Sequence, residues 1–158
     1  KIDDKITSKE LRLKVKEVII QMLKKHFFAL FDKNINSTVQ DESKVVLCSI
    51  INREDEKINW NKSSCEIDAK IRALYDKPIA YTTLNNNIIK LHKAHITNLD
   101  SSNKTPGQIL DISKDGIIVA TKDKAIALTR IQLSGKKPND VSTLVNGKLP
   151  FALNDICQ

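Results

Sequence analysis

The residues of this chain that could take part in chemistry are mainly cationic. Residues 129–147 read as a strand-like run, a loop that places Lys136 and Lys137 next to each other, and a short amphipathic run. Two adjacent positive charges held between two ordered elements suit an anionic partner, above all phosphate groups. Further candidate cations occupy other strand-like runs; they are Lys90, Lys93 and Arg130.

Groups suited to catalysis or metal binding are scarce. His92 and His95 are three residues apart in a strand-like run, so we expect their side chains on opposite faces and not around one metal ion. The acidic cluster 54–56 lies between Arg53 and Lys57, as in a solvated linker. The sequence also lacks a Gly-rich phosphate loop, a nucleophile elbow and paired cysteines. We therefore expect no catalytic residue, no metal site and no cofactor site in this segment.

The positive charge is unevenly distributed along the chain. The formal net charge is +7 over 158 residues. Residues 1–58 contain 12 Lys and Arg against 10 Asp and Glu, whereas residues 59–158 contain 14 against 9. The excess in the second part favours a phosphate-rich partner, and a lysine-rich surface that serves only solvation is the alternative. Three scattered cysteines are typical of a reducing compartment, and no apolar run approaches the ~18 residues of a membrane span.

The first 33 residues predict one long amphipathic helix. Thr7-Ser8-Lys9-Glu10 is a capping box, and apolar residues then recur mostly every four positions as far as Phe31. Such a wide apolar face needs a large partner, and little else in the chain is available to cover it. The chain also opens with Lys1 and holds its single methionine at Met22. These observations predict that the sequence is a piece of a longer protein.

The remainder predicts a linker followed by a small domain, which makes the fold class α+β. Residues 34–58 are polar and charged, with one strand-like stretch at 44–51. A second capping box, Ser63-x-x-Glu66, opens a helix, and a short helix is expected at about 140–145. Five strand-like runs lie between them: 79–84, 88–96, 108–113, 117–121 and 125–133. Short strands with tight turns favour a small β-barrel of the oligonucleotide-binding (OB) type.

On such a barrel the candidate cations could converge. Lys90 and His92 are expected to share one strand face, with Leu91 on the other. If Arg130 and the lysine pair border the same face, the resulting groove would follow a phosphate backbone. Aromatic residues make up only 4% of the chain, which favours a reader of shape and phosphates over a reader of stacked bases.

Several motifs, in the right order, resemble the C-terminal half of the methionyl-tRNA formyltransferase family. The matching segments are Lys57-Ile58-Asn59-Trp60, Ile71-Arg72-Ala73, Thr105-Pro106-Gly107-Gln108-Ile109-Leu110, Asp115-Gly116-Ile117, Ile131-Gln132-Leu133, Gly135-Lys136-Lys137 and Leu144-Val145-Asn146-Gly147. The resemblance covers essentially the whole chain. Three positions depart from the family pattern: Asn59 replaces an aspartate, Lys77 replaces a tryptophan, and Ile50 replaces a linker lysine.

The resemblance implies a division into domains. Residues 1–33 resemble the end of the catalytic domain with its last helix, residues 34–58 the interdomain linker, and residues 59–158 the C-terminal OB-like barrel. The family's catalytic Asn, His and Asp, and its Ser-Leu-Leu-Pro neighbourhood, belong to a Rossmann-like N-terminal domain. Neither Asn-x-His nor Ser-Leu-Leu-Pro occurs here. The resemblance therefore implies that this segment grips tRNA and is inactive by itself.

The resemblance also implies a reaction and partners. The family transfers a formyl group from 10-formyltetrahydrofolate to the amino group of methionyl initiator tRNA in translation initiation. The residues that would contact tRNA are Lys136, Lys137, Arg130, Lys90 and Lys93. We expect a monomeric protein of the bacterial cytoplasm that works with the missing catalytic domain. Two alternatives remain: a stand-alone nucleic-acid-binding module left from a truncated gene, and the C-terminal domain of another folate-dependent formyltransferase.

Overall fold

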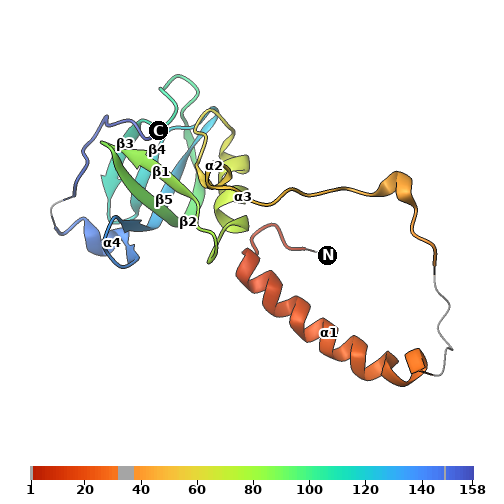
Figure 1. The fold of residues 1–158 in the computed structure, drawn as a ribbon. Coiled ribbons are helices and arrows are strands. Elements are labelled where there is room, and N and C mark those ends of the chain that lie inside the picture. Colours follow the sequence, from red (N-terminus) through yellow and green to blue (C-terminus); the bar gives the residue numbers. More distant parts are fainter. Residues whose placement is uncertain (1, 32–37, 148) are drawn as a thin grey trace.

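The computed structural model describes residues 2–31, 38–147 and 149–158. A curved β-sheet with short helices forms one part, and a long helix projects away from it (Figure 1). The helices are α1 (Ser8–Phe31), α2 (Arg53–Glu56), α3 (Ser64–Ala73) and α4 (Val141–Leu144), with a 3₁₀ turn at Glu42–Lys44. The strands are β1 (Tyr81–Leu84), β2 (Asn87–Asp100), β3 (Ile109–Ser113), β4 (Gly116–Val119), β5 (Lys124–Leu133) and β6 (Asn139–Asp140). The predicted α+β class is confirmed.

All strand pairings in the sheet are antiparallel. The order is β1-β2-β5-β4-β3, and β6 pairs with β5 outside this path. The five predicted strands are all present, with β2 running four residues beyond its predicted end, to Asp100. The two-residue strand β6 was not predicted from the sequence. The last short helix begins at Val141 with Asp140 as its N-cap.

The sheet is open, and the C-terminal segment lies between its two edge strands. Gln158 and Thr83 of β1 exchange two backbone hydrogen bonds, each 2.8 Å long. On the other edge, the Ile109 amide donates to the Asp155 carbonyl at 2.9 Å, and the Cys157 amide donates to the Gly107 carbonyl at 2.8 Å. Residues 154–158 thus bridge the gap between the two edge strands and close the barrel by backbone hydrogen bonds. The predicted barrel is correct in shape, and its closure depends on this non-strand segment.

Gly107 is required where the C-terminal segment passes. Its φ is +87°, in the left-handed region. A Cβ atom at this position would lie 2.3 Å from the carbonyl oxygen of Cys157, which is backbone and cannot turn aside. Only glycine therefore combines this conformation with this close approach.

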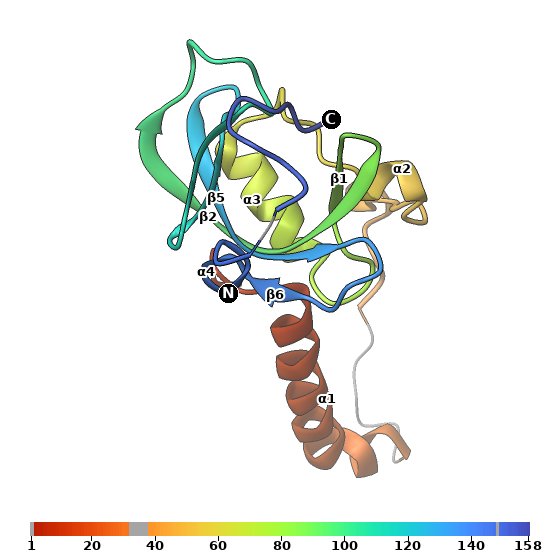
Figure 2. The same ribbon diagram turned by 90° about the vertical axis from the view of Figure 1, so that its left-hand side faces the viewer.

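The barrel encloses a core of aliphatic residues, as the scarcity of aromatic residues predicts. Its members include Ile71, Leu91, Val119, Ile126 and Ile131, each at most 1% exposed. Helix α3 adds its buried face to this core, and Figure 2 shows it beyond the curved strands, at the far end of the barrel.

Helix α3 is fixed at its N-terminus by three side chains. The capping box predicted from Ser63 and Glu66 is present. In addition, the Ser64 amide donates to Asp123 Oδ1 at 2.7 Å, from the turn that precedes β5. This backbone hydrogen bond is the largest cause of the lowered pKa of Asp123, which is about 2. An ionised carboxylate at a helix N-terminus also interacts favourably with the helix dipole.

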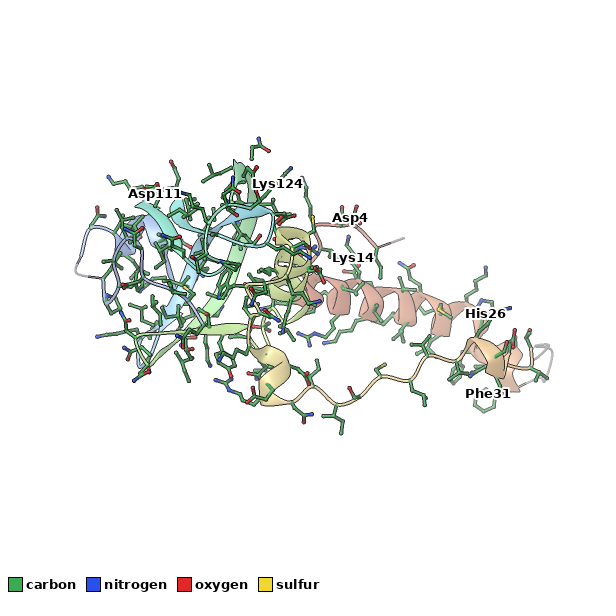
Figure 3. All side chains as sticks on the ribbon, turned by 90° about the horizontal axis from the view of Figure 1, so that it is seen from above. Asp4, Lys14, His26, Phe31, Asp111 and Lys124 are labelled. Carbon is green, nitrogen blue, oxygen red and sulfur yellow. The ribbon has the colours of Figure 1, made fainter. Side chains whose placement is uncertain are left out.

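Helix α1 forms as predicted, but none of its apolar side chains is buried. The capping box holds, since the Thr7 amide donates to Glu10 at 2.9 Å and the Glu10 amide donates to Thr7 Oγ1 at 3.3 Å. None of the 24 residues of the helix is buried, and Phe28 and Phe31 are 76% and 72% exposed. Figure 3 shows α1 extending well beyond the barrel, with Phe31 near its far end. Across the described ranges, no helix is both long and apolar enough to cross a membrane.

Three polar contacts join the start of α1 to the end of α3. Ser8 Oγ donates to the Tyr75 carbonyl at 2.6 Å, and Arg72 Nη1 donates to the Ile6 carbonyl at 3.3 Å. Lys9 and Asp76 form an ion pair at 3.6 Å. These contacts hold the helix end without burying apolar surface.

Residues 38–56, which precede the barrel, contain only a 3₁₀ turn and the short helix α2. Residues 45–52 form no strand, although an apolar strand was predicted at 44–51. Val46, Leu47 and Ile50 are more than 85% exposed, because no sheet edge lies along them to accept a strand. Residues 34–37 of the predicted linker, with the polar turn expected there, lie outside the described residues. The linker meets the barrel where the Arg53 guanidinium stacks 4.0 Å from the centre of the Tyr81 ring.

Candidate nucleic-acid interface

Four residues of β2 and β5 form a polar face on the outside of the barrel. The two strands pair antiparallel, with Lys90 opposite Gln132 and Lys93 opposite Arg130. Directly opposed residues of paired strands project from the same face, and Gln132 and Arg130 are alternate residues of β5. Lys90, Lys93, Arg130 and Gln132 therefore share one face, which we call the basic face.

The basic face depends on an irregularity in β2. In a regular strand, residues three apart point to opposite faces, so Lys90 and Lys93 would be separated. Here the register moves from Leu91 opposite Ile131 to Lys93 opposite Arg130, which leaves His92 as an extra residue. Bulges of this kind redirect side chains. The structure thus brings the three predicted strand cations together, by a bulge that simple alternation does not predict.

The three cations differ in their partners. Arg130 Nη1 donates to Asp140 Oδ1 at 3.1 Å, so an ion pair links β5 to β6. No ion pair engages Lys90 or Lys93 within the described part of the chain. Lys93 is exposed and Lys90 is partly exposed. The two lysines are therefore better placed than Arg130 to meet an external anion.

His92 lies among these cations but is held as a neutral ring. Its Nε2 is 3.3 Å from Gln132 Oε1, and the ring of Tyr75 approaches edge-on with 6.4 Å between ring centres. Partial burial lowers the pKa of His92 below its ordinary value of 6.5, and the charges of Arg130 and Lys90 act in the same direction. At neutral pH the ring consequently adds hydrogen-bonding capacity to the face and no charge.

Lys136 and Lys137 follow a tight turn at the end of β5. The Lys136 amide donates to the Leu133 carbonyl at 3.0 Å, and Gly135 has a φ of 71° that glycine adopts without steric cost. Gln132 Nε2 donates to the Lys136 carbonyl at 2.8 Å, which attaches the turn to the basic face. Both lysines are exposed.

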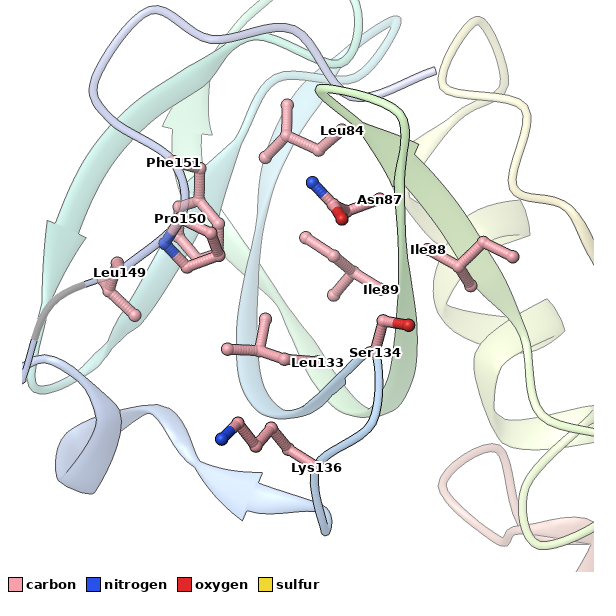
Figure 4. Close-up of a pocket in the computed structure, with 10 residues that line it drawn as sticks. All are labelled: Leu84, Asn87, Ile88, Ile89, Leu133, Ser134, Lys136, Leu149, Pro150 and Phe151. Carbon is pink, nitrogen blue, oxygen red and sulfur yellow. The ribbon is translucent and has the colours of Figure 1, made fainter.

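Lys136 also borders an apolar pocket of about 380 Å³ at one end of the barrel (Figure 4). The other lining residues are Leu84, Asn87, Ile88, Ile89, Leu133, Ser134, Leu149, Pro150 and Phe151. Figure 4 shows the Lys136 side chain along the edge of this pocket. The lysine pair therefore stands at the border between the pocket and the basic face, and not within the row of strand cations.

The sequence analysis missed three residues of this surface. Gln132 is two positions from Arg130, so strand alternation could have placed it on the same face. Tyr75 comes from the end of α3, and only the packing of that helix brings it to His92. Asp140 belongs to a two-residue strand whose pairing with β5 has no local signal in the sequence.

Groups for covalent or metal chemistry do not gather on this surface. Within the described residues, no cluster of three or more His, Cys, Asp or Glu side chains could hold a metal ion. Burial raises the pKa of the Cys157 thiol to about 12, so this thiol stays protonated and is a poor nucleophile at neutral pH. The arrangement offers positive charge and hydrogen-bonding groups, which suit binding.

A family model described as "Formyl transferase, C-terminal domain" matches residues 50–149. The match spans more than half of the chain, and the chain belongs to this family of C-terminal domains. The helices, the antiparallel barrel and the charged outer face described above are how this sequence builds that domain.

Several bacterial methionyl-tRNA formyltransferases are similar to this chain in sequence. The methionyl-tRNA formyltransferase of Mycoplasma mycoides is 40% identical, over 78% of this chain and 40% of the relative. That of Ureaplasma urealyticum is 38% identical, over 96% of this chain and 49% of the relative. That of Staphylococcus epidermidis is 41% identical, over 80% of this chain and 41% of the relative. The chain thus spans less than half of the length of these bacterial enzymes.

Solved structures of HypX from Aquifex aeolicus share the fold. One variant matches with a TM-score of 0.69 and 16% identity, over 93% of this chain and 27% of HypX. A HypX complex with tetrahydrofolic acid matches with a TM-score of 0.60 and 14% identity, over 80% of this chain and 22% of HypX. At these identities the similarity concerns the fold alone.

Proposed function

We propose that this chain is the C-terminal part of a methionyl-tRNA formyltransferase and that its barrel binds tRNA. The observation that carries the proposal is the convergence of Lys90, Lys93 and Arg130 on one face, next to the turn that bears Lys136 and Lys137. A row of cations on a rigid sheet can follow a sugar-phosphate backbone, and such contacts position an RNA without reading its sequence. The lysines contribute more than Arg130, because Arg130 shares its charge with Asp140 whereas no ion pair within the described residues engages any of the four lysines.

In the whole protein, the barrel would position the acceptor arm of initiator methionyl-tRNA for a catalytic domain. That domain would be Rossmann-like and would precede this segment, and the formyl donor would be 10-formyltetrahydrofolate. Helix α1 would belong to it, and its exposed apolar side chains would pack there. The whole enzyme would act as a monomer in the bacterial cytoplasm.

The relatives support a tRNA substrate over another formyl acceptor. The methionyl-tRNA formyltransferases quoted above are 38–41% identical to this chain, whereas the HypX structures are 14–16% identical. The match with the Ureaplasma enzyme extends over 96% of this chain and so includes the segment that forms the barrel. The domain of another folate-dependent formyltransferase remains the second candidate, and tRNA binding by this chain discriminates between them.

Salt-dependent binding tests the proposal. We expect the 158-residue chain to bind an initiator tRNA transcript, with affinity falling steeply with added KCl because each phosphate contact releases counterions. With about 4 to 6 contacts, the affinity should fall by roughly two orders of magnitude between 50 and 200 mM salt. Undetectable binding at 50 mM salt would contradict the proposal.

Paired substitutions locate the interface. Lys90→Ala with Lys93→Ala, and Lys136→Ala with Lys137→Ala, should each reduce the slope of log affinity against log salt by about 1 to 2. Lys114→Ala is the matched control, because this exposed lysine lies in the turn between β3 and β4, neither of which pairs with β2. If the control changes the slope of log affinity against log salt equally, the chain binds RNA through its overall positive charge and not through a defined interface.

A further inference from the structure

The centre of the basic face carries a neutral group where a phosphate-binding surface would be expected to carry a cation. His92 is the extra residue of the bulge between Lys90 and Lys93. Its ring contacts both the Gln132 amide and the Tyr75 ring. Lys90 and Arg130 are close enough to lower the pKa of His92, as burial also does. The ring is thus neutral and flanked by positive charge.

The hydrogen bonds around Gln132 decide which ring nitrogen carries the proton. The amide nitrogen of Gln132 donates to the Lys136 carbonyl at 2.8 Å, so its amide oxygen is the atom that faces His92. An amide oxygen only accepts, and it lies 3.3 Å from His92 Nε2. Nε2 must therefore be the protonated nitrogen. In a neutral imidazole the other nitrogen, Nδ1, is then an acceptor.

An acceptor in the middle of the basic face has a definite chemical preference. Phosphodiester oxygens have no proton to donate, so they cannot bond to His92 Nδ1. A ribose 2′-hydroxyl can donate, and A-form RNA presents these groups along a wide and shallow minor groove. Along an RNA strand each ribose lies between two phosphates. The basic face has a matching order, because a neutral acceptor between cations corresponds to a ribose hydroxyl between phosphates.

The geometry points to His92 as a ribose contact: Nδ1 accepts a hydrogen bond from an RNA 2′-hydroxyl while the flanking lysines contact the adjacent phosphates. This inference rests on the proposed tRNA binding and adds to it a means of distinguishing RNA from DNA. Gln132 acts through His92 as a positioning residue, because it fixes the tautomer and the ring orientation. The Tyr75 ring also packs edge-on against the His92 ring.

The test compares a tRNA transcript with its 2′-fluoro counterpart, which keeps the phosphates and the A-form but has no hydroxyl proton. The wild-type chain should bind the 2′-fluoro tRNA about 3- to 10-fold more weakly, the range expected for one hydrogen bond. His92→Ala should lose a similar factor on natural tRNA, and it should bind the two tRNAs equally. Its salt slope should stay unchanged, because no phosphate contact is removed.

Two further variants separate the ribose contact from a merely structural role. His92→Asn can place its amide oxygen near the position of Nδ1 and should recover part of the discrimination, whereas His92→Gln reaches the position of Nε2 and should not. His95→Ala, an exposed histidine of the same strand, is the matched control and should behave as wild type. Thermal unfolding of each variant reports whether the barrel is intact.

Different failures have different meanings. If the wild-type chain binds tRNA and His92→Ala still discriminates between the two tRNAs, the ribose contact is wrong and the proposed function stands. A reduced salt slope in His92→Ala would likewise overturn the inference, since it would make His92 a phosphate contact. If the wild-type chain binds no tRNA, the proposed function and this inference fall together.

Discussion

Helix α1 and the barrel are built from similar residue types, yet they bury them very differently. The barrel encloses its aliphatic side chains within an open sheet whose two edges are bridged by the C-terminal segment, and many of these side chains are less than 2% exposed. Helix α1 has no buried residue, and polar groups at and just before its first turn contact the end of α3 and the residues that follow it. The free energy of the barrel fold therefore comes from residues within it, whereas α1 contributes little to it. The comparison teaches that capping and local helix propensity suffice to form α1, whereas the barrel is held together by the burial of its apolar side chains.

The largest expected effect follows from breaking the closure of the barrel. Gly107→Ala should destabilise the chain by about 3 kcal/mol or more, since the new methyl group meets the Cys157 carbonyl at an unfavourable φ. Urea unfolding followed by Trp60 fluorescence measures the change, because Trp60 is buried beside this segment. Gly147→Ala is the matched control, as its Cβ would meet its nearest atom at 3.6 Å. Equal effects of the two changes would show that the C-terminal segment does not hold the barrel together.

A smaller loss is expected where α3 is tied to the barrel. Asp123→Asn should cost about 1 to 2 kcal/mol at pH 7, because a neutral amide replaces a carboxylate that accepts from the Ser64 amide. The folded-state pKa of about 2 lies below the ordinary 3.8, so this stabilisation is present above pH 4 and disappears as the pH falls toward 2. Unfolding measured from pH 7 to pH 2 should show the variant and wild type converging in acid. A constant difference over this range would contradict the role of the charge.

The two capping boxes provide a matched pair across the two regions. Ser63→Ala should lower the stability of the barrel by about 1 kcal/mol, since it removes the cap of a helix whose face is in the core. Thr7→Ala removes the same chemistry from α1 and should leave the unfolding midpoint of the barrel unchanged. Far-ultraviolet circular dichroism should show only fraying of α1. A similar loss of barrel stability in both variants would mean that α1 and the barrel unfold as one unit.

The smallest effect is expected from removing α1 altogether. A chain that starts at residue 53 keeps the cation-π contact of Arg53 with Tyr81. It loses the polar contacts of residues 6–9 and the Asn52 cap of the short helix α2. Its thermal midpoint should lie within about 2 °C of the full chain, because no core residue is lost. Binding of a hydrophobic dye should fall, because the exposed apolar surface of α1 is gone. A midpoint lowered by 10 °C would show that α1 supports the barrel.

The features that the sequence did not predict all depend on contacts between residues that are far apart in the chain. The stretch 44–51 has the apolar pattern of a strand, but a strand needs a neighbouring edge, and Val46 and Leu47 meet none. The candidate cations were identified by type, while their grouping depended on the bulge at His92. The pairing of Arg130 with Asp140 was likewise invisible, because ten residues and a turn separate them in the chain.

The sequence by itself determined the local elements of this protein. The capping boxes at Thr7 and Ser63, the period of the long helix and the five main strand segments arise from interactions over a few residues, which a pattern records directly. Only the tertiary structure decided how the barrel closes, which cations share a face, and that His92 sits neutral between Tyr75 and Gln132. These features depend on which distant segments pair and in what register, and such pairing is chosen by the packing of the whole core.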